Sequence, residues 1–427
     1  MNYKININPK IAFCKIKDEY HILNSKGEIL TLKGISVQIW DMLLENYDFD
    51  EIVKSIKNKF HDISYKLIEK DVMKVINKLI EKNILIKIYG DENKHTEIKN
   101  KYIDVVEFKG LWEKAIINTV PLKVDIELTN NCNLNCKYCY VDLANDVNIK
   151  NIDLNLMVSL IDQLKEMGTL FITLTGGECT LHPNFMDIVK YALKSNFYIR
   201  VLTNGSTLTK KQIMELDKIS SKGLLGLDIS IHSFREEIFD DFTKNSGTFS
   251  KVINCINNIK DTNIPLRLIC NITNYNIQEI SSIREFCKNN NLDIVFNPIV
   301  YPTINKKSNE DFYINKLEIE KLIDNNILLP RKSFCTALKS KCWIDYNGNV
   351  NVCEFIREST GNIKNSKFKN IWNELISNIN LRESLKLDKE CTDCKLKENC
   401  LICPGLLNLN KNKSYFCNSA QIAHGIS

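Results

Sequence analysis

The segment that decides the fold reads Val124-Asp-Ile-Glu-Leu-Thr-Asn-Asn-Cys132-Asn-Leu-Asn-Cys136-Lys-Tyr-Cys139. It begins with a short apolar run, which predicts a strand, and ends with three closely spaced thiols. Thiolates are soft ligands that select zinc, copper(I) or iron-sulfur clusters. A structural zinc ion requires a fourth protein ligand, whereas a four-iron cluster can leave one iron open to substrate. The trio therefore favours a cluster, with a zinc site or a chance grouping as the alternative.

The spacing Cys-x3-Cys-x2-Cys, with the aromatic Tyr138 before the last cysteine, resembles the signature of the radical S-adenosylmethionine (SAM) enzymes. The resemblance implies that Cys132, Cys136 and Cys139 hold a [4Fe-4S] cluster whose free iron binds the amino and carboxylate groups of SAM. It places Tyr138 among the cofactor-binding residues. It also implies that reduction cleaves SAM to a 5'-deoxyadenosyl radical, which can take hydrogen from an unactivated carbon.

Length and composition limit the remaining possibilities. A chain of 427 residues is too long for one ordinary domain. Its 57 basic and 52 acidic residues are interspersed and give a net charge of only +5, so charge offers no argument for a nucleic acid partner. No apolar run reaches a membrane span and no secretory signal is present, so we expect a cytoplasmic protein. Sixteen cysteines in such a chain indicate metal or redox chemistry more than disulfides.

The first 89 residues have the pattern of a small α+β domain. Two apolar segments around an Asn-Ser-Lys-Gly turn predict a hairpin, and helical spacing of apolar residues predicts three helices before a closing strand. The second helix is expected to begin at an Asp50 cap. The expected segments are strands 20–23 and 28–32, helices 35–43, 50–60 and 67–80, and strand 84–88.

This order resembles the winged-helix-like recognition element of systems that mature ribosomally made peptides. The resemblance implies that a leader peptide adds as a strand to the hairpin edge and rests on the third helix. Five lysines recur along that helix and could favour an acidic leader, although a solvated helix face and a DNA-binding winged helix are alternatives. These lysines are Lys66, Lys70, Lys74, Lys78 and Lys82.

Residues 90–121 are polar and lack sustained periodicity, which predicts a linker. Residues 122–300 then alternate strand and helix patterns, as in parallel β/α architecture. The expected strands are 124–128, 170–174, 197–202, 224–231, 266–272 and 292–297. The fold class is therefore α/β, with a partial (β/α)6 barrel of the kind that radical SAM cores have.

Polar residues indicate where the chemistry lies in this barrel. Asp228, Ser230 and His232 share one face of the fourth strand by period-two alternation and are expected to line a polar lumen. Chemistry in β/α barrels sits at the C-terminal strand ends, where the cysteine trio, the segment 176–178 and Asn204 fall.

Gly176, Gly177 and Glu178 follow the second strand. The glycines would let the backbone approach a ligand, and the carboxylate could accept a hydrogen bond from an ammonium group. They resemble the SAM methionine-binding motif, although Cys179 replaces the usual proline. Cys179 is expected to be a small buried residue, with a radical-accessible thiol as the alternative. Asn204 and Ser230 match positions that meet the SAM ribose and carboxylate.

Eight cysteines gather in residues 334–420, after a bridging region at 301–333. Their paired spacing could form a zinc ribbon, but their order, with a hairpin turn at Asn347-Gly348, resembles the SPASM domain. That resemblance implies two auxiliary [4Fe-4S] clusters. Their expected ligands are Cys335, Cys342, Cys353 and Cys403 for the first cluster and Cys391, Cys394, Cys400 and Cys417 for the second. The scattered Cys14, Cys255, Cys270 and Cys287 are expected to be core thiols.

The chain is therefore identified as a radical SAM/SPASM peptide maturase similar to sactipeptide synthases, with three [4Fe-4S] clusters and SAM as cofactors. The expected partners are a precursor peptide with a leader and an electron donor such as flavodoxin or ferredoxin. The expected product is a thioether crosslink. Carbon-carbon or carbon-oxygen crosslinking, oxidation of a serine or cysteine as in sulfatase maturation, and a noncatalytic zinc-bearing peptide-binding or DNA-binding protein are the alternatives.

Overall fold

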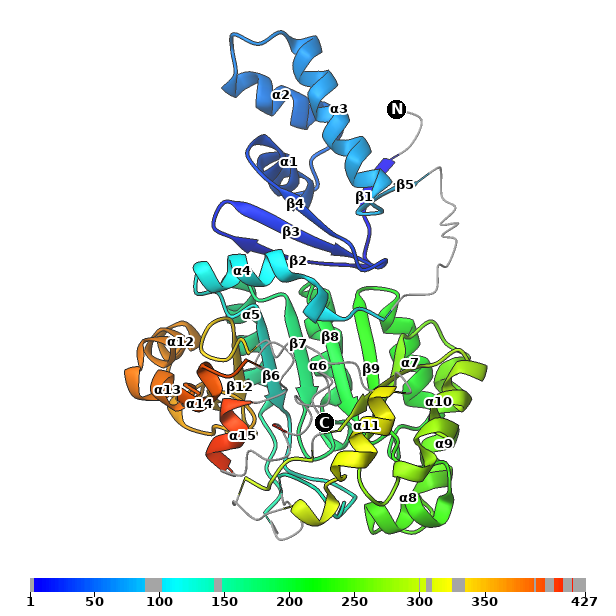
Figure 1. Cartoon of the computed structure of the whole chain (residues 1–427). Coiled ribbons are helices and arrows are strands. Elements are labelled where there is room, and N and C mark those ends of the chain that lie inside the picture. Colours follow the sequence, from blue (N-terminus) through cyan, green and yellow to red (C-terminus); the bar gives the residue numbers. More distant parts are fainter. Residues whose placement is uncertain are drawn as a thin grey trace.

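The chain is described by a computed structural model. The structure describes residues 4–88, 102–141, 148–298, 300–304, 309–324, 335–387, 389–395, 403–409 and 417. A long sheet forms its centre, with an N-terminal unit at one end of the strands and a C-terminal unit beside the first barrel strand (Figure 1). No helix within the described ranges is long and apolar enough to cross a membrane.

The N-terminal unit contains the predicted hairpin, three helices and closing strand. Strands β2, β3 and β4 form an antiparallel sheet, and β1 pairs with β5. Two strands, β1 and β2, were not predicted from the sequence. The elements are β1 (Lys4–Ile7), β2 (Ile11–Ile16), β3 (Glu19–Asn24), β4 (Ile29–Leu32), α1 (Ile35–Leu44), α2 (Phe49–Lys59), α3 (Tyr65–Glu81) and β5 (Leu85–Ile88).

The predicted cap of the second helix was wrong by two residues. Asp48 is the N-cap of α2: its carboxylate accepts a hydrogen bond from the Glu51 backbone N–H at 2.8 Å, and the Glu51 carboxylate accepts one from the Asp48 N–H at 2.8 Å. This capping box satisfies two backbone donors at once. Asp50 lies in the first turn of the helix instead.

The predicted linker also needs correction, because its described part, residues 102–121, contains helix α4 (Lys109–Ile117). Leu111 and Trp112 of α4 are buried, and the Trp112 indole donates a hydrogen bond to the Val105 carbonyl at 2.8 Å. The helix is short and no side chain caps its start, so its sequence gives little indication of a helix. Its apolar residues share a core with the sheet β2–β4 and with the N-terminal ends of the barrel strands, at Leu122, Leu170, Phe171, Tyr198 and Leu224.

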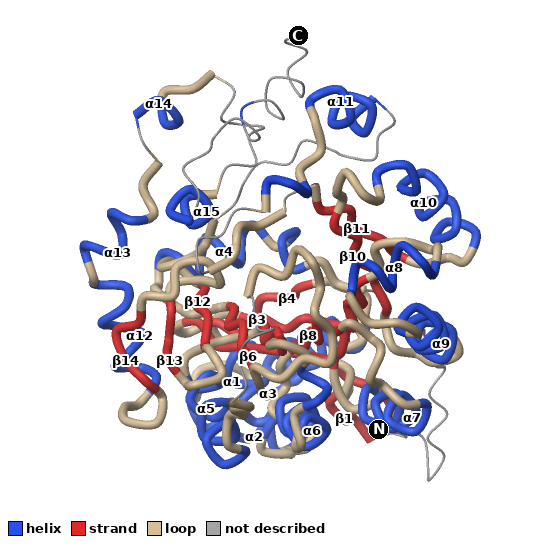
Figure 2. Tube along the Cα trace, turned by 90° about the horizontal axis from the view of Figure 1, so that it is seen from below, coloured by secondary structure: helices blue, strands red, loops and turns tan. Residues whose placement is uncertain are grey.

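The predicted partial barrel is confirmed. Six strands run parallel in the order β11-β10-β9-β8-β7-β6, and helices lie along the outer side of their curved row (Figure 2). The strands are β6 (Lys123–Glu127), β7 (Phe171–Thr175), β8 (Tyr198–Thr203), β9 (Leu224–Ser230), β10 (Leu266–Asn271) and β11 (Asp293–Asn297). The helices are α5 (Leu154–Glu166), α6 (Phe185–Lys194), α7 (Lys210–Ser220), α8 (Glu236–Thr243), α9 (Thr248–Lys260), α10 (Ile280–Asn289) and α11 (Lys316–Asp324).

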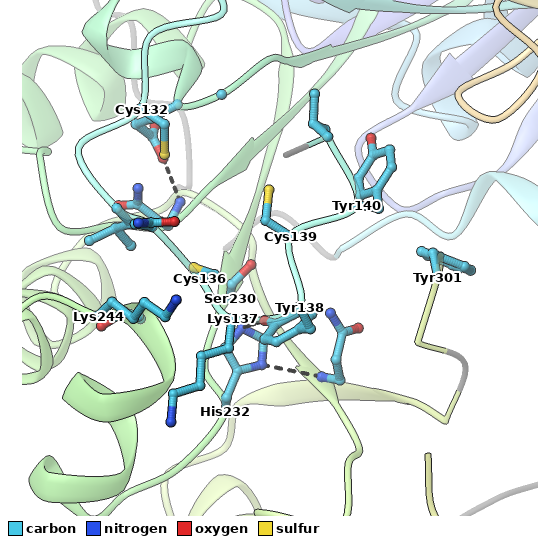
Figure 3. A pocket seen from close by; sticks show the side chains of 18 of the residues that line it. Cys132, Cys136, Lys137, Tyr138, Cys139, Tyr140, Ser230, His232, Lys244 and Tyr301 are labelled. Carbon is cyan, nitrogen blue, oxygen red and sulfur yellow. Dashed lines mark hydrogen bonds between the residues drawn. The ribbon is translucent and has the colours of Figure 1, made fainter. Parts of the chain in front are cut away.

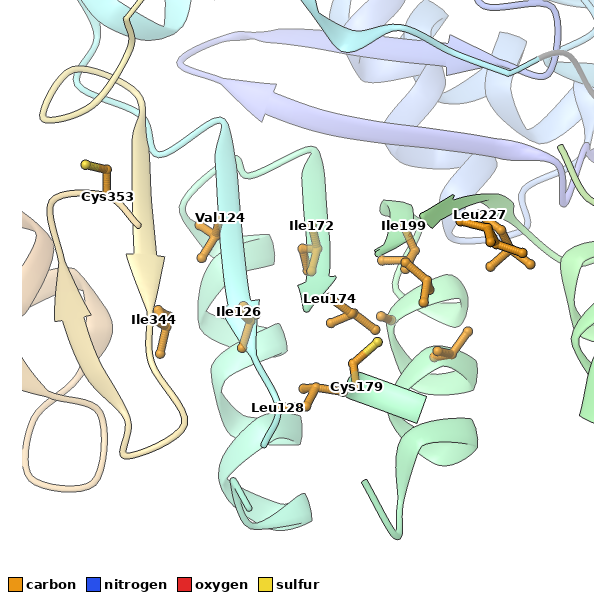
Figure 4. Packing of buried hydrophobic residues seen from close by; sticks show 14 of the residues in the cluster. Val124, Ile126, Leu128, Ile172, Leu174, Cys179, Ile199, Leu227, Ile344 and Cys353 are labelled. Atoms are coloured by element: carbon orange, nitrogen blue, oxygen red, sulfur yellow. The ribbon is translucent and has the colours of Figure 1, made fainter. Parts of the chain in front are cut away.

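The two faces of the strands differ as their sequences predict. Aliphatic side chains such as Ile126, Leu174 and Leu227 belong to the main apolar core, where Cys179 also lies (Figure 4). The opposite face carries Asp228, which is buried and bridges Arg200 of β8 and Arg267 of β10, with Arg267 Nε 3.0 Å from its carboxylate. This ion cluster joins three neighbouring strands on their lumen side.

The C-terminal unit extends the barrel sheet. Strand β12 runs parallel to β6 and is followed by antiparallel β13 and β14, a junction that the sequence did not predict. The predicted turn at Asn347-Gly348 is present, and Gly348 has a φ of +90° that favours glycine. The elements are β12 (Lys341–Ile344), β13 (Asn349–Asn351), β14 (Ser359–Asn362), α12 (Phe368–Ser377), α13 (Ile379–Ser384), α14 (Lys389–Thr392) and α15 (Pro404–Leu409).

Candidate metal and cofactor site

A cavity of about 410 Å³ lies at the C-terminal ends of the barrel strands (Figure 3). Its lining comes from the loop after β6, the loop after β7, the end of β8 and the ends of β9 and β10. All nine residues that the sequence assigned to the SAM site line this one cavity. They are Cys132, Cys136, Tyr138, Cys139, Gly176, Gly177, Glu178, Asn204 and Ser230.

The C-terminal end of α8 holds the cysteine loop from one side. The Asn135 N–H donates to the Thr243 carbonyl at 3.1 Å, and the Lys137 N–H donates to the Phe242 carbonyl at 3.0 Å. The Lys137 ammonium also pairs with Asp241 at 2.6 Å. The last carbonyls of a helix lack intrahelical hydrogen-bond donors. The backbone N–H groups of the loop supply these donors. The loop is thereby shaped by protein contacts.

The two glycines allow the loop after β7 to pack directly on the loop after β6. The Gly177 N–H donates to the Thr129 carbonyl and the Glu178 N–H to the Asn131 carbonyl, both at 2.8 Å. A Cβ on Gly176 would lie 2.4 Å from the Thr129 oxygen, and one on Gly177 would lie 2.5 Å from the Asn131 oxygen. Glycine is therefore required here for contact between two backbones, in addition to any approach to a ligand.

The Glu178 carboxylate is hydrogen-bonded to other groups of the protein. It accepts hydrogen bonds from the Thr203 hydroxyl at 2.7 Å, from the Asn204 N–H at 2.6 Å and from Thr180. These bonds tie the loop after β7 to the end of β8. The side chain is buried, and burial raises the pKa of its carboxyl. Its bond to the ammonium group of SAM stays a prediction.

Asn204 reaches the cysteine loop. Its amide donates to Asn133 Oδ1 at 3.0 Å, and the Asn133 amide donates to the Ser206 hydroxyl at 2.8 Å. The Asn133 carbonyl accepts from the Asn245 amide at 2.9 Å. Asn133 therefore joins the end of β8, the cysteine loop and the segment after α8.

His232 was predicted to face the lumen, but its contact with Tyr138 was not foreseen. The Tyr138 hydroxyl is hydrogen-bonded to His232 Nε2, and the Asn271 N–H donates to His232 Nδ1 at 3.4 Å. Burial lowers the pKa of His232 to about 3, so the ring is neutral at pH 7. Because Nδ1 accepts, Nε2 carries the proton and donates to Tyr138. The Phe242 ring lies edge-on to the Tyr138 ring, with 5.1 Å between the ring centres. This contact also holds Tyr138 in place.

The three thiols match a metal group with one open position. Burial is the main cause that raises the pKa of Cys132 to about 11 and that of Cys136 to about 12, so metal binding must displace their protons. No fourth cysteine occurs among the described lining residues. In the described ranges, no three Cys, His, Asp or Glu side chains converge on the position of a single metal ion. A four-iron cluster separates its ligands more widely than one ion does, and binding of such a cluster by the three thiols stays a prediction.

The C-terminal cysteines are only partly brought together in the part of the chain that the structure describes. Burial is the main cause that raises the pKa of Cys403 to about 11. The charge of the nearby Cys335 adds to this rise. The Cys353 sulfur lies 3.5 Å from the position of a Cβ on Gly405, near Cys403. Cys342 is fully buried in β12. Cys391, Cys394 and Cys417 are partly or fully exposed. Cys400 lies outside the described residues, so the two ligand sets stay predictions.

The remaining cysteines are core residues, as predicted: Cys14, Cys179, Cys255, Cys270 and Cys287 are buried. The Cys179 thiol donates to the Leu202 carbonyl at 3.3 Å, and it belongs to the main apolar core.

Three aromatic side chains lie between the cavity and the C-terminal cysteines. The centre of the Phe355 ring lies 5.9 Å from the centre of the Tyr140 ring and 4.7 Å from that of the Tyr301 ring. Tyr140 follows Cys139 directly, Phe355 lies two residues after Cys353, and both tyrosines line the cavity. This contact could not be predicted from the sequence, because its members lie in three distant segments.

Three family models match the chain. They are the Radical SAM superfamily over residues 126–287, the SPASM iron-sulfur cluster-binding domain over 335–395, and coenzyme PQQ synthesis protein D (PqqD) over 19–85. Their order along the chain is PqqD, radical SAM and SPASM.

Relatives and solved structures agree with these matches. The antilisterial bacteriocin subtilosin biosynthesis protein AlbA of Bacillus subtilis is 27% identical over 317 residues, covering 69% of each chain. Streptococcus suis SuiB bound to precursor peptide SuiA has a TM-score of 0.63 at 16% identity, covering 96% of this chain and 98% of that one. The protein anSMEcpe with bound AdoMet has a TM-score of 0.56 at 19% identity, covering 72% and 93%. At such identities the structural likeness concerns the fold.

Proposed function

Because this chain belongs to the radical SAM enzymes that carry a SPASM domain and a PqqD-like domain, we propose that it forms a thioether crosslink in a ribosomally made precursor peptide. The observation that supports this most is the gathering of three thiols, two glycines and Ser230 around one cavity, in a chain with a peptide-recognition fold. The noncatalytic zinc-protein and DNA-binding alternatives do not agree with membership of this enzyme family.

The proposed ligands of the SAM-binding [4Fe-4S] cluster are Cys132, Cys136 and Cys139. When bound, this cluster and SAM supply a 5'-deoxyadenosyl radical that abstracts hydrogen from the peptide. The protein's own part is to hold the cysteine loop, through α8 and the loop after β7. Tyr138, Gly176, Gly177, Glu178, Asn204 and Ser230 are the proposed SAM-contacting residues.

The proposed auxiliary clusters lie in the C-terminal unit, with the two ligand sets predicted from the sequence. Cys335, Cys353 and Cys403 lie near one another, which supports the first set. Tyr140 and Tyr301 line the cavity and contact Phe355, so a peptide in the cavity would lie beside this aromatic cluster. Flavodoxin or ferredoxin is the proposed electron donor.

Leader recognition is assigned to residues 1–89, hydrogen abstraction to 122–300 and auxiliary cluster binding to 334–420. The N-terminal unit packs on the N-terminal strand ends, whereas the cavity lies at the C-terminal ends. A bound peptide must therefore run along the barrel to reach the cavity. A leader fixed at the far end raises the effective concentration of the rest of the peptide at the cavity mouth.

The thioether is preferred because the domain plan of the chain resembles that of sactipeptide synthases, and because AlbA, a subtilosin biosynthesis protein, is 27% identical over 317 residues. Carbon-carbon and carbon-oxygen crosslinks remain the second candidates, since the side chains of the peptide decide the fate of its radical. Sulfatase-type oxidation of a serine or cysteine would not require the PqqD-like domain.

The test uses full-length protein reconstituted without oxygen, together with a Cys-containing candidate precursor peptide. We expect about twelve irons with matching sulfide, formation of 5'-deoxyadenosine, and a peptide lighter by two hydrogens whose cysteine no longer reacts with iodoacetamide. Fragmentation mass spectrometry then locates the bond. A lighter peptide that retains a reactive cysteine would support the carbon-carbon or carbon-oxygen alternative, and zinc without iron would overturn the proposal.

A further inference from the structure

Two lysines line the cavity, and only one has a carboxylate partner. Lys137 pairs with Asp241 at 2.6 Å and lies over the Tyr275 ring at 5.4 Å. Lys244 makes no ion pair with any carboxylate among the described residues. Figure 3 shows its side chain extending from the end of α8 towards the side of the cavity where Cys136 and Ser230 lie. A flexible cation is therefore available at this wall.

The backbone of Lys244 is unusual for a lysine. It ends α8 in the left-handed conformation, with a φ of +50° and a ψ of +37°. Glycine or asparagine is the common residue at such helix ends, because a Cβ is unfavourable there. Lys244 is exposed and outside the apolar cores, so packing does not explain the choice. Strained positions of this kind cluster at ligand-binding sites.

The structure assigns to Lys244 the carboxylate of the methionyl group of SAM. This inference rests on the proposed use of SAM. A carboxylate entering the cavity loses water and requires charged hydrogen-bond donors in return. Lys137 is already paired, Glu178 is an acid, and His232 is neutral at pH 7. Lys244 is thus the one unpaired cation among the described lining residues, on the same side as Ser230.

The experiment compares two ligands on reconstituted full-length protein by isothermal titration calorimetry. SAM carries the amino and carboxylate groups, whereas 5'-methylthioadenosine lacks both. The variants are Lys244→Gln, Lys244→Arg and Lys244→Gly, with Lys251→Gln on the exposed side of α9 as the matched control. We expect Lys244→Gln and Lys244→Gly to weaken SAM binding about tenfold or more, as loss of a charged hydrogen bond does. Lys244→Arg should retain most of the affinity.

Three further readouts separate carboxylate binding from a structural role. The affinity for 5'-methylthioadenosine and the iron content should not change in any variant. Lys244→Gly should also keep the melting temperature of the parent protein or raise it, because glycine tolerates the left-handed conformation.

Unchanged SAM affinity in Lys244→Gln would overturn the assignment. So would an equal loss for both ligands, or a loss of iron, because the lysine would then shape the cavity or the cluster. Absence of SAM binding by the parent protein would instead overturn the proposed function, and this assignment with it.

Discussion

Arg357 and Glu127 form a bidentate ion pair, in which the two guanidinium nitrogens lie 2.6 and 3.0 Å from the two carboxylate oxygens. Glu127 ends β6, five residues before Cys132, and is 1% exposed. Arg357 belongs to the C-terminal unit, four residues after Cys353. The pair therefore joins the C-terminal unit to the strand that leads into the cysteine loop.

Replacement of Arg357 by leucine should destabilise the protein strongly. It leaves the Glu127 carboxylate buried without its partner, which costs about 3–5 kcal/mol in comparable sites. Glu127→Gln in the Arg357→Leu background should recover part of this loss, because the buried charge is removed. Urea denaturation of the parent protein and the two variants measures the effect. Equal stability of Arg357→Leu and the parent protein would show that the pair contributes little.

Replacement of Gly177 by alanine should disrupt the cavity. The added Cβ would lie 2.5 Å from the Asn131 oxygen and 2.8 Å from the Asn130 oxygen, so the two loops must separate. We expect loss of SAM binding and reduced iron content. Gly110→Ala is the control, because no atom lies within 4 Å of its added Cβ and its φ is not positive. Retention of full SAM affinity by Gly177→Ala would contradict the packing of the two loops.

Cys136→Ala should abolish formation of 5'-deoxyadenosine, because two thiolates cannot hold a cluster with one open iron. Cys179→Ala is the matched control, since this thiol is buried in the apolar core. The control should keep iron and SAM cleavage at a small cost in stability. Chromatography of the reaction products and iron analysis check both variants. Persistent cleavage in Cys136→Ala would remove the assignment of the site.

Strand β4 offers a test of leader binding, because among the described strands it pairs with β3 alone. The Asn24 N–H donates to the Glu28 carbonyl at 3.0 Å, so these two residues form a hydrogen-bonded pair. Hydrogen-bonded and non-hydrogen-bonded pairs alternate along antiparallel strands, which makes His21 and Thr31 a non-hydrogen-bonded pair. The N–H of Thr31 therefore points away from β3. Thr31→Pro should weaken binding of the precursor peptide at least several-fold by removing this donor, while uncoupled SAM cleavage persists. Fluorescence anisotropy of a labelled peptide measures the affinity.

Thr31→Val is the control for that variant, because it removes the hydroxyl contact with His21 but keeps the backbone donor. Equal peptide affinity of the proline and valine variants would indicate that the leader docks elsewhere.

Stability should fall as the pH is lowered from about 6.5 to about 4. His21 is buried, and burial together with Lys33 lowers its pKa to about 4. Glu19 lies 3.9 Å from its ring but also pairs with Lys33 and Lys114. The unfolded chain takes up a proton near pH 6.5 and the folded protein only near 4, so acid favours unfolding. The contribution is at most about 3 kcal/mol over the whole window.

Urea denaturation at pH 7 and pH 5 measures this effect. The parent protein should lose more stability between the two pH values than His21→Gln does, since glutamine does not titrate. Parallel losses in both proteins would assign the pH dependence to other groups.

The six barrel strands and the two loops that line the cavity could be predicted because their signals are local. Val124 to Cys139 places three thiols after an apolar run, and Asp228, Ser230 and His232 alternate with aliphatic residues along one strand. The polar face, the core thiols and the turn at Gly348 follow from the same rules, and the structure contains all of them. The cap at Asp48 was missed because two acids compete at neighbouring positions and only backbone geometry decides between them.

Contacts between distant segments could not be predicted. Most element types, the barrel and the nine residues of the proposed SAM site could be predicted, because hydrophobic period and motif spacing act over a few residues. Four other features are seen only in the folded chain: α4 packs beneath the barrel, β12 extends its sheet, α8 holds the cysteine loop and Lys244 reaches the cavity. Each of these depends on packing between segments far apart in the chain, for which a single sequence carries no local signal.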